Sequence, residues 1–237
     1  MKRLAAVILL ALTAAAGTHK VSRDTAALEF NYEWAAEAAA IPKLDLILYK
    51  KAKAALAEAQ KFAAEDVASA RQDKRDFQQH YYDAGWQVAG ASKTLLSLQY
   101  GDDTFEGGAH PNHNYGALLW DKLKAREIAV SSLFTDDAFG ALTRRAYCAA
   151  LDKERLERRE GEKIGGEFDE CPKYSELAIA LSDKDHDGRF DAIAFGASPY
   201  VAGPYVEGPY DIELPVSQAL IAALRPEYRA SFEVQRQ

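Results

Sequence analysis

The sequence lacks the short motifs that identify many enzyme classes. Among 237 residues there is no Walker-type phosphate loop, no glycine-rich dinucleotide fingerprint and no G-x-S-x-G nucleophile turn. It holds two cysteines and no C-x-x-C pair. These absences argue against nucleotide-dependent chemistry and serine hydrolysis. With 36 aspartates and glutamates, chance carboxylate pairs are abundant, so a glycosidase cannot be inferred from them either.

An excess of positive charge is also missing. The chain has 29 lysines and arginines against 36 acidic residues, which gives a net charge of −7 at pH 7. An acidic protein is a poor partner for nucleic acid or anionic lipid, because both repel negative charge. A basic protein is the macromolecular partner that this charge would suit. Solubility alone is the other reading of the same charge.

The chain has no apolar run long enough for an ordinary membrane span. Leu4–Ala16 is almost wholly apolar, but this is about 13 residues where a span needs roughly 20. Lys2 and Arg3 precede the run, and small alanines end it. The pattern predicts a cleaved signal peptide over residues 1–16, with an uncleaved anchor as the alternative. We therefore expect a periplasmic or secreted protein with a mature net charge of −9 and no membrane span.

The two cysteines, Cys148 and Cys171, are expected to form one disulfide. An even pair in an oxidising compartment normally pairs. Closing a loop of this length stabilises the fold by about 3 kcal/mol in the chain-entropy model. Catalytic or metal-binding roles are the weaker alternatives, since neither cysteine has a histidine beside it.

The N-terminal half predicts a sheet covered by one long helix. Residues 28–34 alternate apolar and polar side chains, as a half-buried strand does. Pro42 stands where a helix can start, and helical spacing follows to give a helix over about 43–72. Strand-like runs come next, at 77–88, 94–100 and 115–120. This order predicts an α+β fold with an antiparallel meander sheet.

The C-terminal half predicts a second, central helix and further short strands. Asp136 and Asp137 can cap a helix over about 137–159, which becomes highly charged after Leu151. Short strands follow at about 177–181, 189–197 and 211–214, with an Asp-rich turn at 183–188 and a terminal helix at 216–224. We expect an N-terminal region at 26–135 and a C-terminal region at 136–237, packed as one compact unit.

Two distant segments carry unusual composition. Gly107–Tyr115 (the histidine loop) and Pro199–Tyr210 (the tyrosine loop) are rich in glycine, proline, asparagine and tyrosine. Such residues set special backbone angles beside aromatic faces, which suits recognition loops. We predict that the two loops lie on one face and form a ligand-binding site. Its expected residues are His110, Asn112, Tyr115, Tyr200 and Tyr205.

Read together, these segments resemble a known exported domain pair. The matching stretches are Gly107–Asn112 (GGAHPN), Val130–Phe134 (VSSLF) and Ser198–Gly208, with a late Pro-Glu-Tyr at 226–228. The pair occurs outside the membrane in the RsiV anti-sigma factor and ahead of the catalytic domain in PdaC-type peptidoglycan deacetylases. The resemblance covers about residues 26–228.

The resemblance implies a binding module more than an enzyme. RsiV is a lysozyme receptor, so this module can present a protein-binding surface. The chain shows no TFDDG aspartate motif of a polysaccharide deacetylase and no sigma-binding segment. We therefore expect a non-catalytic envelope module without a cofactor. Its expected partners are peptidoglycan fragments or a basic wall-acting protein such as lysozyme.

Histidine chemistry is the first alternative. His110 and His113 stand three residues apart, where they could share a metal or provide a general base. A third metal ligand is not evident. A hydrolase of envelope polymers would use His110 with a nearby carboxylate. The structural alternative is that His110 and Asn112 hydrogen-bond the loop backbone.

A calcium-stabilised envelope protein is the second alternative. Asp183, Asp185, Asp187 and Asp191 follow the oxygen spacing of a calcium loop, with glycine at the sixth position. Ala194 stands where the bidentate glutamate is expected, so Glu207 would have to act from elsewhere. The competing reading is an acidic β-turn that joins two strands. We expect the plain turn and assign no metal site.

Overall fold

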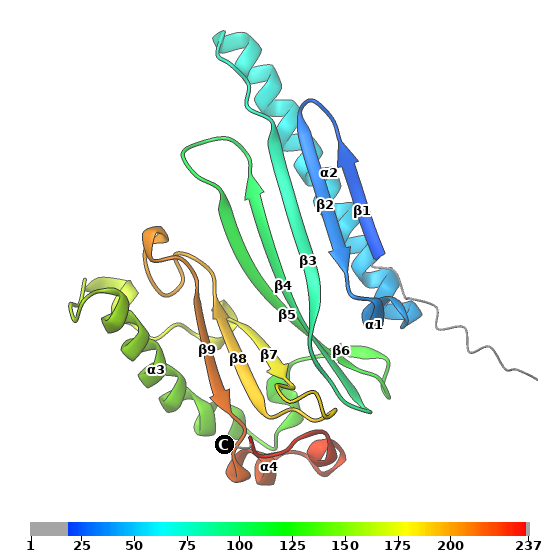
Figure 1. The fold of residues 1–237 in the computed structure, drawn as a ribbon, viewed down its shortest axis with the longest axis vertical. Coiled ribbons are helices and arrows are strands. Elements are labelled where there is room, and N and C mark those ends of the chain that lie inside the picture. Colours follow the sequence, from blue (N-terminus) through cyan, green and yellow to red (C-terminus); the bar gives the residue numbers. More distant parts are fainter. Residues whose placement is uncertain (1–18, 236–237) are drawn as a thin grey trace, which may run out of the picture.

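The computed structural model describes residues 19–235, and the predicted signal peptide at residues 1–16 lies outside them. Within the described part, no helix is both long and apolar enough to cross a bilayer. Two sheets and two main helices form an α+β fold (Figure 1). The predicted fold class is therefore confirmed.

The first sheet has six strands in sequence order. They are β1 (His19–Asp24), β2 (Leu28–Trp34), β3 (His80–Ala91), β4 (Leu95–Phe105), β5 (Asn112–Asp121) and β6 (Arg126–Ile128). From β3 to β6 the strands form the expected antiparallel meander. The pair β2–β3 is parallel, which the meander prediction missed. Two helices, α1 (Ala36–Ala39) and α2 (Pro42–Asp73), connect β2 to β3 and return the chain to the starting end of the sheet. A crossover of this kind allows neighbouring strands to be parallel.

The long helix lies over one face of the first sheet. After the short α1 (Ala36–Ala39), α2 (Pro42–Asp73) begins at its proline and ends at Lys74, which has the left-handed conformation. Its inward residues recur at helical spacing and are buried: Leu44, Leu48, Ala52, Leu56, Ala59 and Ala63. They pack with aromatic side chains of the sheet, among them Phe30, Tyr32 and Trp34. The apolar face that the helical spacing predicts is therefore the buried face of α2.

The second sheet packs with the central helix. Strands β7 (Ala178–Ser182), β8 (Ala192–Ala197) and β9 (Tyr210–Pro215) form an antiparallel sheet, and α3 (Ala138–Arg158) buries Tyr147 and Leu151 in the same core as Phe195. The short α4 (Gln218–Ala223) follows. Short 3₁₀ helices follow the first sheet along the chain: η1 (Val130–Leu133), η2 (Gly166–Asp169), η3 (Tyr174–Glu176), η4 (Tyr205–Glu207) and η5 (Pro226–Ser231).

The two sheets meet at one end and are joined by polar contacts. The backbone N–H of Leu181 in β7 donates to the buried Ser97 hydroxyl of β4, at 2.9 Å. The backbone N–H of Asp183 donates to the carbonyl of Ala89 in β3, at 3.2 Å. Leu95 and Leu119, from the first sheet, belong to the core of the second. In the sequence, all strands of the first sheet precede residue 136 and all strands of the second sheet follow it. The domain boundary at this residue stays a prediction.

Cys148 and Cys171 form a disulfide, as the sequence predicted. Their Cα atoms are 5.6 Å apart. The bond ties the middle of α3 to the segment that leads into η3. Because reducing compartments normally keep thiols free, a disulfide points to an extracytoplasmic location.

Candidate functional site

The histidine loop and the tyrosine loop meet in space, as predicted. The Tyr205 hydroxyl donates to the carbonyl of Pro111 at 2.6 Å. The Tyr205 ring stacks on the His110 ring, with centroids 3.8 Å apart. The Tyr200 hydroxyl lies 3.5 Å from Nε2 of His110. Side chains about 90 residues apart in the sequence therefore form one surface.

Tyr115 has a different place from the other predicted site residues. It lies within β5, where its backbone N–H donates to the Ser198 hydroxyl at 2.9 Å. Its own hydroxyl lies 3.4 Å from an Asp211 carboxylate oxygen. Tyr115 thus links the first sheet to Ser198, just before the tyrosine loop, and to β9, and it does not line the cleft between the loops.

A cleft of about 380 Å³ opens where the loops meet α2 and the first sheet. The predicted residues Asn112, Tyr200 and Tyr205 line it. The other lining residues are Ala55, Glu58, Ala59, Phe62, Tyr82, Asp102, Thr104, Glu106, His113, Asn114 and Pro199. We call this the loop cleft. Its lining holds three carboxylates and no lysine or arginine, so it is an acidic site with aromatic walls.

Hydroxyl groups fix Asp102 on the floor of the loop cleft. The Tyr100 hydroxyl donates to Asp102 at 2.9 Å and lies 2.9 Å from the Tyr82 hydroxyl. The backbone N–H and side-chain amide of Asn114 donate to the other Asp102 oxygen, at 3.0 and 2.9 Å. Burial raises the pKa of Tyr82, and the carboxylates nearby raise it further. The phenol therefore stays neutral and adds no further negative charge.

Arginines of α3 and its end hold the tyrosine loop in place. Arg159 donates from Nε and Nη2 to the two oxygens of Glu207, at 2.8 and 3.0 Å, and from Nη1 to Asp169 at 2.6 Å. The Tyr210 hydroxyl donates to the same Glu207 carboxylate. The buried Arg155 donates to the carbonyl of Ala202 at 2.8 Å. We call Arg159, Glu207, Asp169 and Tyr210 the loop anchor.

Tyr200 is presented outward by a strained backbone. Its φ is 69°, in the left-handed region that an aromatic residue seldom adopts. Its side chain is 56% exposed, and Val206 on the same loop is 89% exposed. Strained residues gather at functional sites, where the surroundings compensate their cost of about 1–3 kcal/mol. The tyrosine loop therefore offers apolar surface beside an acidic cleft.

His110 is engaged in loop structure. Its Nδ1 lies 2.8 Å from the carbonyl of Pro111, and its ring packs on Tyr205. His113 has a carboxylate partner, Asp103, at 3.5 Å. The pairing of His110 with a carboxylate, which the hydrolase alternative requires, does not occur among the contacts of the described residues. The structural role of His110 fits the geometry better.

The Asp-rich segment forms a turn whose aspartates bind its own backbone. Asp183 accepts hydrogen bonds from the N–H groups of Asp187 and Gly188, at 3.1 and 3.0 Å. Asp191 accepts from the N–H of Lys184 at 2.9 Å. Oxygens of Asp183, Asp185 and Asp187 still lie within 4.8 Å of one another. Exposed acidic groups gather in this way without an ion, so these distances assign no metal.

Glu207 is not the missing calcium ligand. The Asp-rich turn precedes β8, whereas Glu207 lies in the connection from β8 to β9, and these two connections are at opposite ends of β8 (Figure 1). Both of its carboxylate oxygens are bonded to Arg159. The expectation that Glu207 could complete a calcium site is therefore wrong, because the loop anchor already uses it.

Replacing Asp183 by alanine should lower the free energy of unfolding by about 2 kcal/mol. Hydrogen bonds to a charged group contribute about 1.5–3 kcal/mol, and Asp183 is only 7% exposed. Asp185→Ala is the matched control, because Asp185 is exposed and accepts none of the turn's backbone bonds. We expect that control to stay within about 0.5 kcal/mol of the parent in urea unfolding. Equal losses in both variants would contradict this account of the turn.

Residues 20–113 match a family model described as "Deacetylase PdaC". This match runs from β1 into the histidine loop. A search of curated proteins finds no match.

Two solved structures have the same fold over almost the whole chain. One is a DUF3298 family protein from Pseudomonas aeruginosa PAO1, with a TM-score of 0.58 and 16% identity, covering 93% of this chain and 97% of that one. The other is a DUF3298 family member from Bacteroides fragilis NCTC 9343, with a TM-score of 0.57 and 18% identity, covering 91% and 95%. Residues 20–113 are therefore similar to the PdaC family model, and the chain as a whole has the fold of these DUF3298 family structures.

Proposed function

We propose that this protein is a non-catalytic binding module of the cell envelope. Its loop cleft captures a basic wall-acting protein, for which lysozyme is the reference example, and a cell-wall component is the second ligand class. The observation that carries this proposal is the loop cleft itself. Two distant loops converge on a hollow with the carboxylates Glu58, Asp102 and Glu106 and no lysine or arginine in its lining.

The chemistry of the loop cleft favours a cationic group. A lysine or arginine of a partner would gain from the carboxylates and from the tyrosine ring faces, which attract cations within about 6 Å. The exposed Tyr200 and Val206 supply apolar contact area around it. Aromatic anchors of this kind dominate many protein interfaces. The mature charge of −9 would also speed the approach of a basic partner.

The proposed location agrees with the chemistry of the chain. The disulfide between Cys148 and Cys171 favours an oxidising compartment. The predicted signal peptide would deliver the protein to the periplasm or outside the cell. We therefore place the module where wall polymers and wall-acting proteins are found.

The family model that matches residues 20–113 has a deacetylase in its name. We propose binding without turnover for this chain, because His110 is occupied by loop contacts and the sequence lacks the TFDDG motif. The assay for this part is release of acetate from acetylated peptidoglycan. Turnover by the purified protein would contradict the proposal.

We expect hen lysozyme to bind the purified protein, and Tyr200→Ala to weaken that binding at least tenfold. The reason is the loss of an exposed aromatic anchor at the loop cleft. Isothermal titration calorimetry measures the affinity, with soluble peptidoglycan fragments as the second ligand. Tyr49→Ala is the matched control, since Tyr49 is 47% exposed on α2 and does not line the cleft.

Charge is tested separately from the aromatic anchor. Glu58→Gln with Glu106→Gln should weaken lysozyme binding and reduce its salt dependence, because both carboxylates line the cleft. Glu65→Gln on α2 removes an exposed charge away from the cleft and should leave the affinity unchanged. No binding of either ligand, or equal losses in the cleft and control variants, would sink the proposed function.

A further inference from the structure

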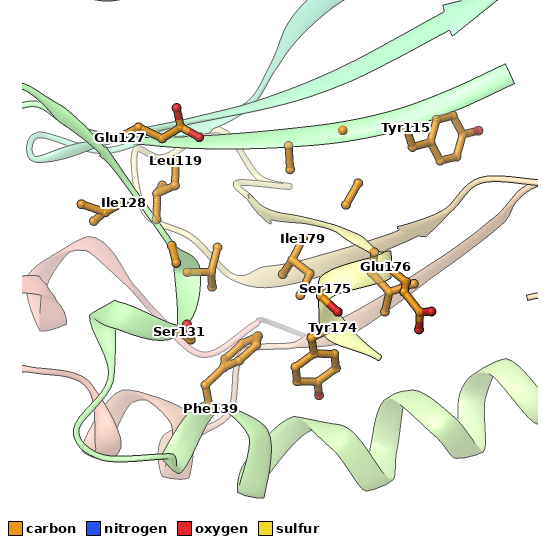
Figure 2. A pocket seen from close by; sticks show the side chains of 16 residues that line it. Tyr115, Leu119, Glu127, Ile128, Ser131, Phe139, Tyr174, Ser175, Glu176 and Ile179 are labelled. Carbon is orange, nitrogen blue, oxygen red and sulfur yellow. The ribbon is translucent and has the colours of Figure 1, made fainter. Parts of the chain in front are cut away.

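A second cavity, distinct from the loop cleft, lies between the two sheets. Its volume is about 720 Å³, and it shares no lining residue with the loop cleft. Its walls are three nearly consecutive runs, at 115–119, 127–131 and 174–179, together with Phe139 (Figure 2). A strand face contributes alternate residues to a cavity, whereas a strand edge contributes consecutive ones. We call this cavity the strand slot.

One wall of the strand slot is an unpaired edge of β5. The N–H of Lys122 donates to the carbonyl of Thr94, on the β4 side. The N–H and C=O groups of even-numbered β5 residues therefore face β4, and those of odd-numbered residues face the outer edge. The N–H of Tyr115 points the other way, to Ser198. The strand β6 covers this outer edge only from Leu119 onward. The peptide group of Ala117 therefore faces the slot, and within residues 19–235 no strand pairs with β5 at this point of its outer edge.

The opposite wall is an unpaired edge of β7. The backbone N–H of Leu181 donates away from β8, to Ser97, and that of Asp183 donates away from it to Ala89. The N–H and C=O groups of odd-numbered β7 residues therefore face away from β8. The peptide group of Ile179 has the same direction as that of Leu181. It faces the strand slot that Ala117 faces from the other side.

The slot also has side chains of defined chemistry. Leu119, Ile128 and Phe139 give it an apolar side. Exposed carboxylates stand near its two ends, Glu127 at one and Glu176 at the other (Figure 2). Unpaired strand edges template the addition of another strand, and proteins recognise extended peptides in this way.

We propose that the strand slot binds an extended peptide segment of a partner protein as an added β-strand. The segment lies in line with β6, pairs with β5 at Ala117 and contacts the β7 edge at Ile179. Its alternate apolar side chains pack on Phe139 and its neighbours, and basic residues at its ends face Glu127 and Glu176. This site is independent of the function proposed for the loop cleft.

The probe is a seven-residue peptide with blocked termini. A lysine at each end flanks five residues that alternate between valine and threonine. We expect it to slow amide hydrogen exchange at Ala117 and Ile179 at least tenfold in NMR spectra of the full purified protein. Two further versions of the peptide carry N-methyl groups, one on all valines and the other on all threonines. Because the N–H groups of alternate residues in a strand point to opposite sides, each version removes the donors along one edge of the bound peptide. Each should bind at least about tenfold more weakly than the unmodified peptide.

Variants of the protein give a second test. Ala117→Pro removes the outward N–H at an edge position, where proline is compatible with a folded sheet. It should weaken peptide binding at least tenfold while the melting temperature confirms folding. Glu127→Gln with Glu176→Gln should weaken the lysine-flanked peptide and leave a serine-flanked version unaffected. Tyr200→Ala, in the loop cleft, should leave peptide binding unchanged.

Three results would overturn the proposal. One is the absence of exchange protection at Ala117 and Ile179 at millimolar peptide. Another is equal affinity of the N-methylated and unmodified peptides, because strand pairing requires those N–H groups. The third is loss of peptide binding in Tyr200→Ala with full binding in Ala117→Pro, which would place the peptide in the loop cleft.

Discussion

Replacing Arg159 by methionine should lower the free energy of unfolding by about 3–5 kcal/mol, the usual result of removing one partner from a buried ion pair. The Arg159 side chain is 5% exposed, and its partner Glu207 is 12% exposed. Without the guanidinium, Glu207 loses its ion pair and keeps the Tyr210 hydroxyl as a neutral hydrogen-bond donor. Because Glu207 belongs to the tyrosine loop, binding at the loop cleft should weaken as well. Urea unfolding followed by circular dichroism measures the stability.

Two controls isolate the loop anchor. Arg145→Met changes an exposed arginine of the same helix and should cost less than about 0.5 kcal/mol. The double variant Arg159→Met with Glu207→Met should lose less than Arg159→Met alone, because the unpaired carboxylate is gone. If Arg159→Met is no worse than Arg145→Met, the anchor does not stabilise the fold.

The loop anchor should also make stability depend on pH. Burial alone would raise the pKa of Glu207, but hydrogen bonds from Arg159 and Tyr210 lower it below its ordinary range. A carboxyl with a lowered pKa in the folded state stabilises the fold above its unfolded pKa, about 4.3 for glutamate. That contribution disappears as the pH falls through the lowered value. Arg159→Met should therefore show a shallower loss of stability than the parent below about pH 4.

Removing the disulfide should lower the free energy of unfolding by about 3 kcal/mol. Cys148 and Cys171 are 23 positions apart, and opening a loop of that length increases the entropy of the unfolded chain by this amount. The double variant Cys148→Ser with Cys171→Ser should match the reduced parent in urea unfolding. A reducing agent should leave the double variant unchanged. Equal stability of the parent with and without reductant would contradict the prediction.

The elements with strong local patterns could be predicted from the sequence. Pro42 and the spacing from Leu48 to Ala63 define α2 to within a residue or two of its ends. The two cysteines were enough to predict their pairing. The shared composition of the two loops also indicated that they meet, and Tyr205 joins them through Pro111.

The features that depend on distant contacts could not be predicted. Glu58 reads as part of the wet face of α2, because nothing local shows that the histidine loop lies over it. The charged run after Leu151 reads as a solvated helix end, yet Arg155 and Arg159 are buried there by partners more than forty residues away. The parallel pairing of β2 with β3 depends on where α2 docks, which periodicity alone does not show.

The order of elements in the first sheet has a consequence for how the chain folds. Strands β3 to β6 are joined by short connections, so their pairings close small loops and can form early. The pairing of β2 with β3 has to wait until all of α1 and α2 has found its place between them. Long-range parallel pairing is intrinsically slow. The β1–β2 hairpin should therefore join last, and its edge is the part of the sheet exposed longest to other chains during folding.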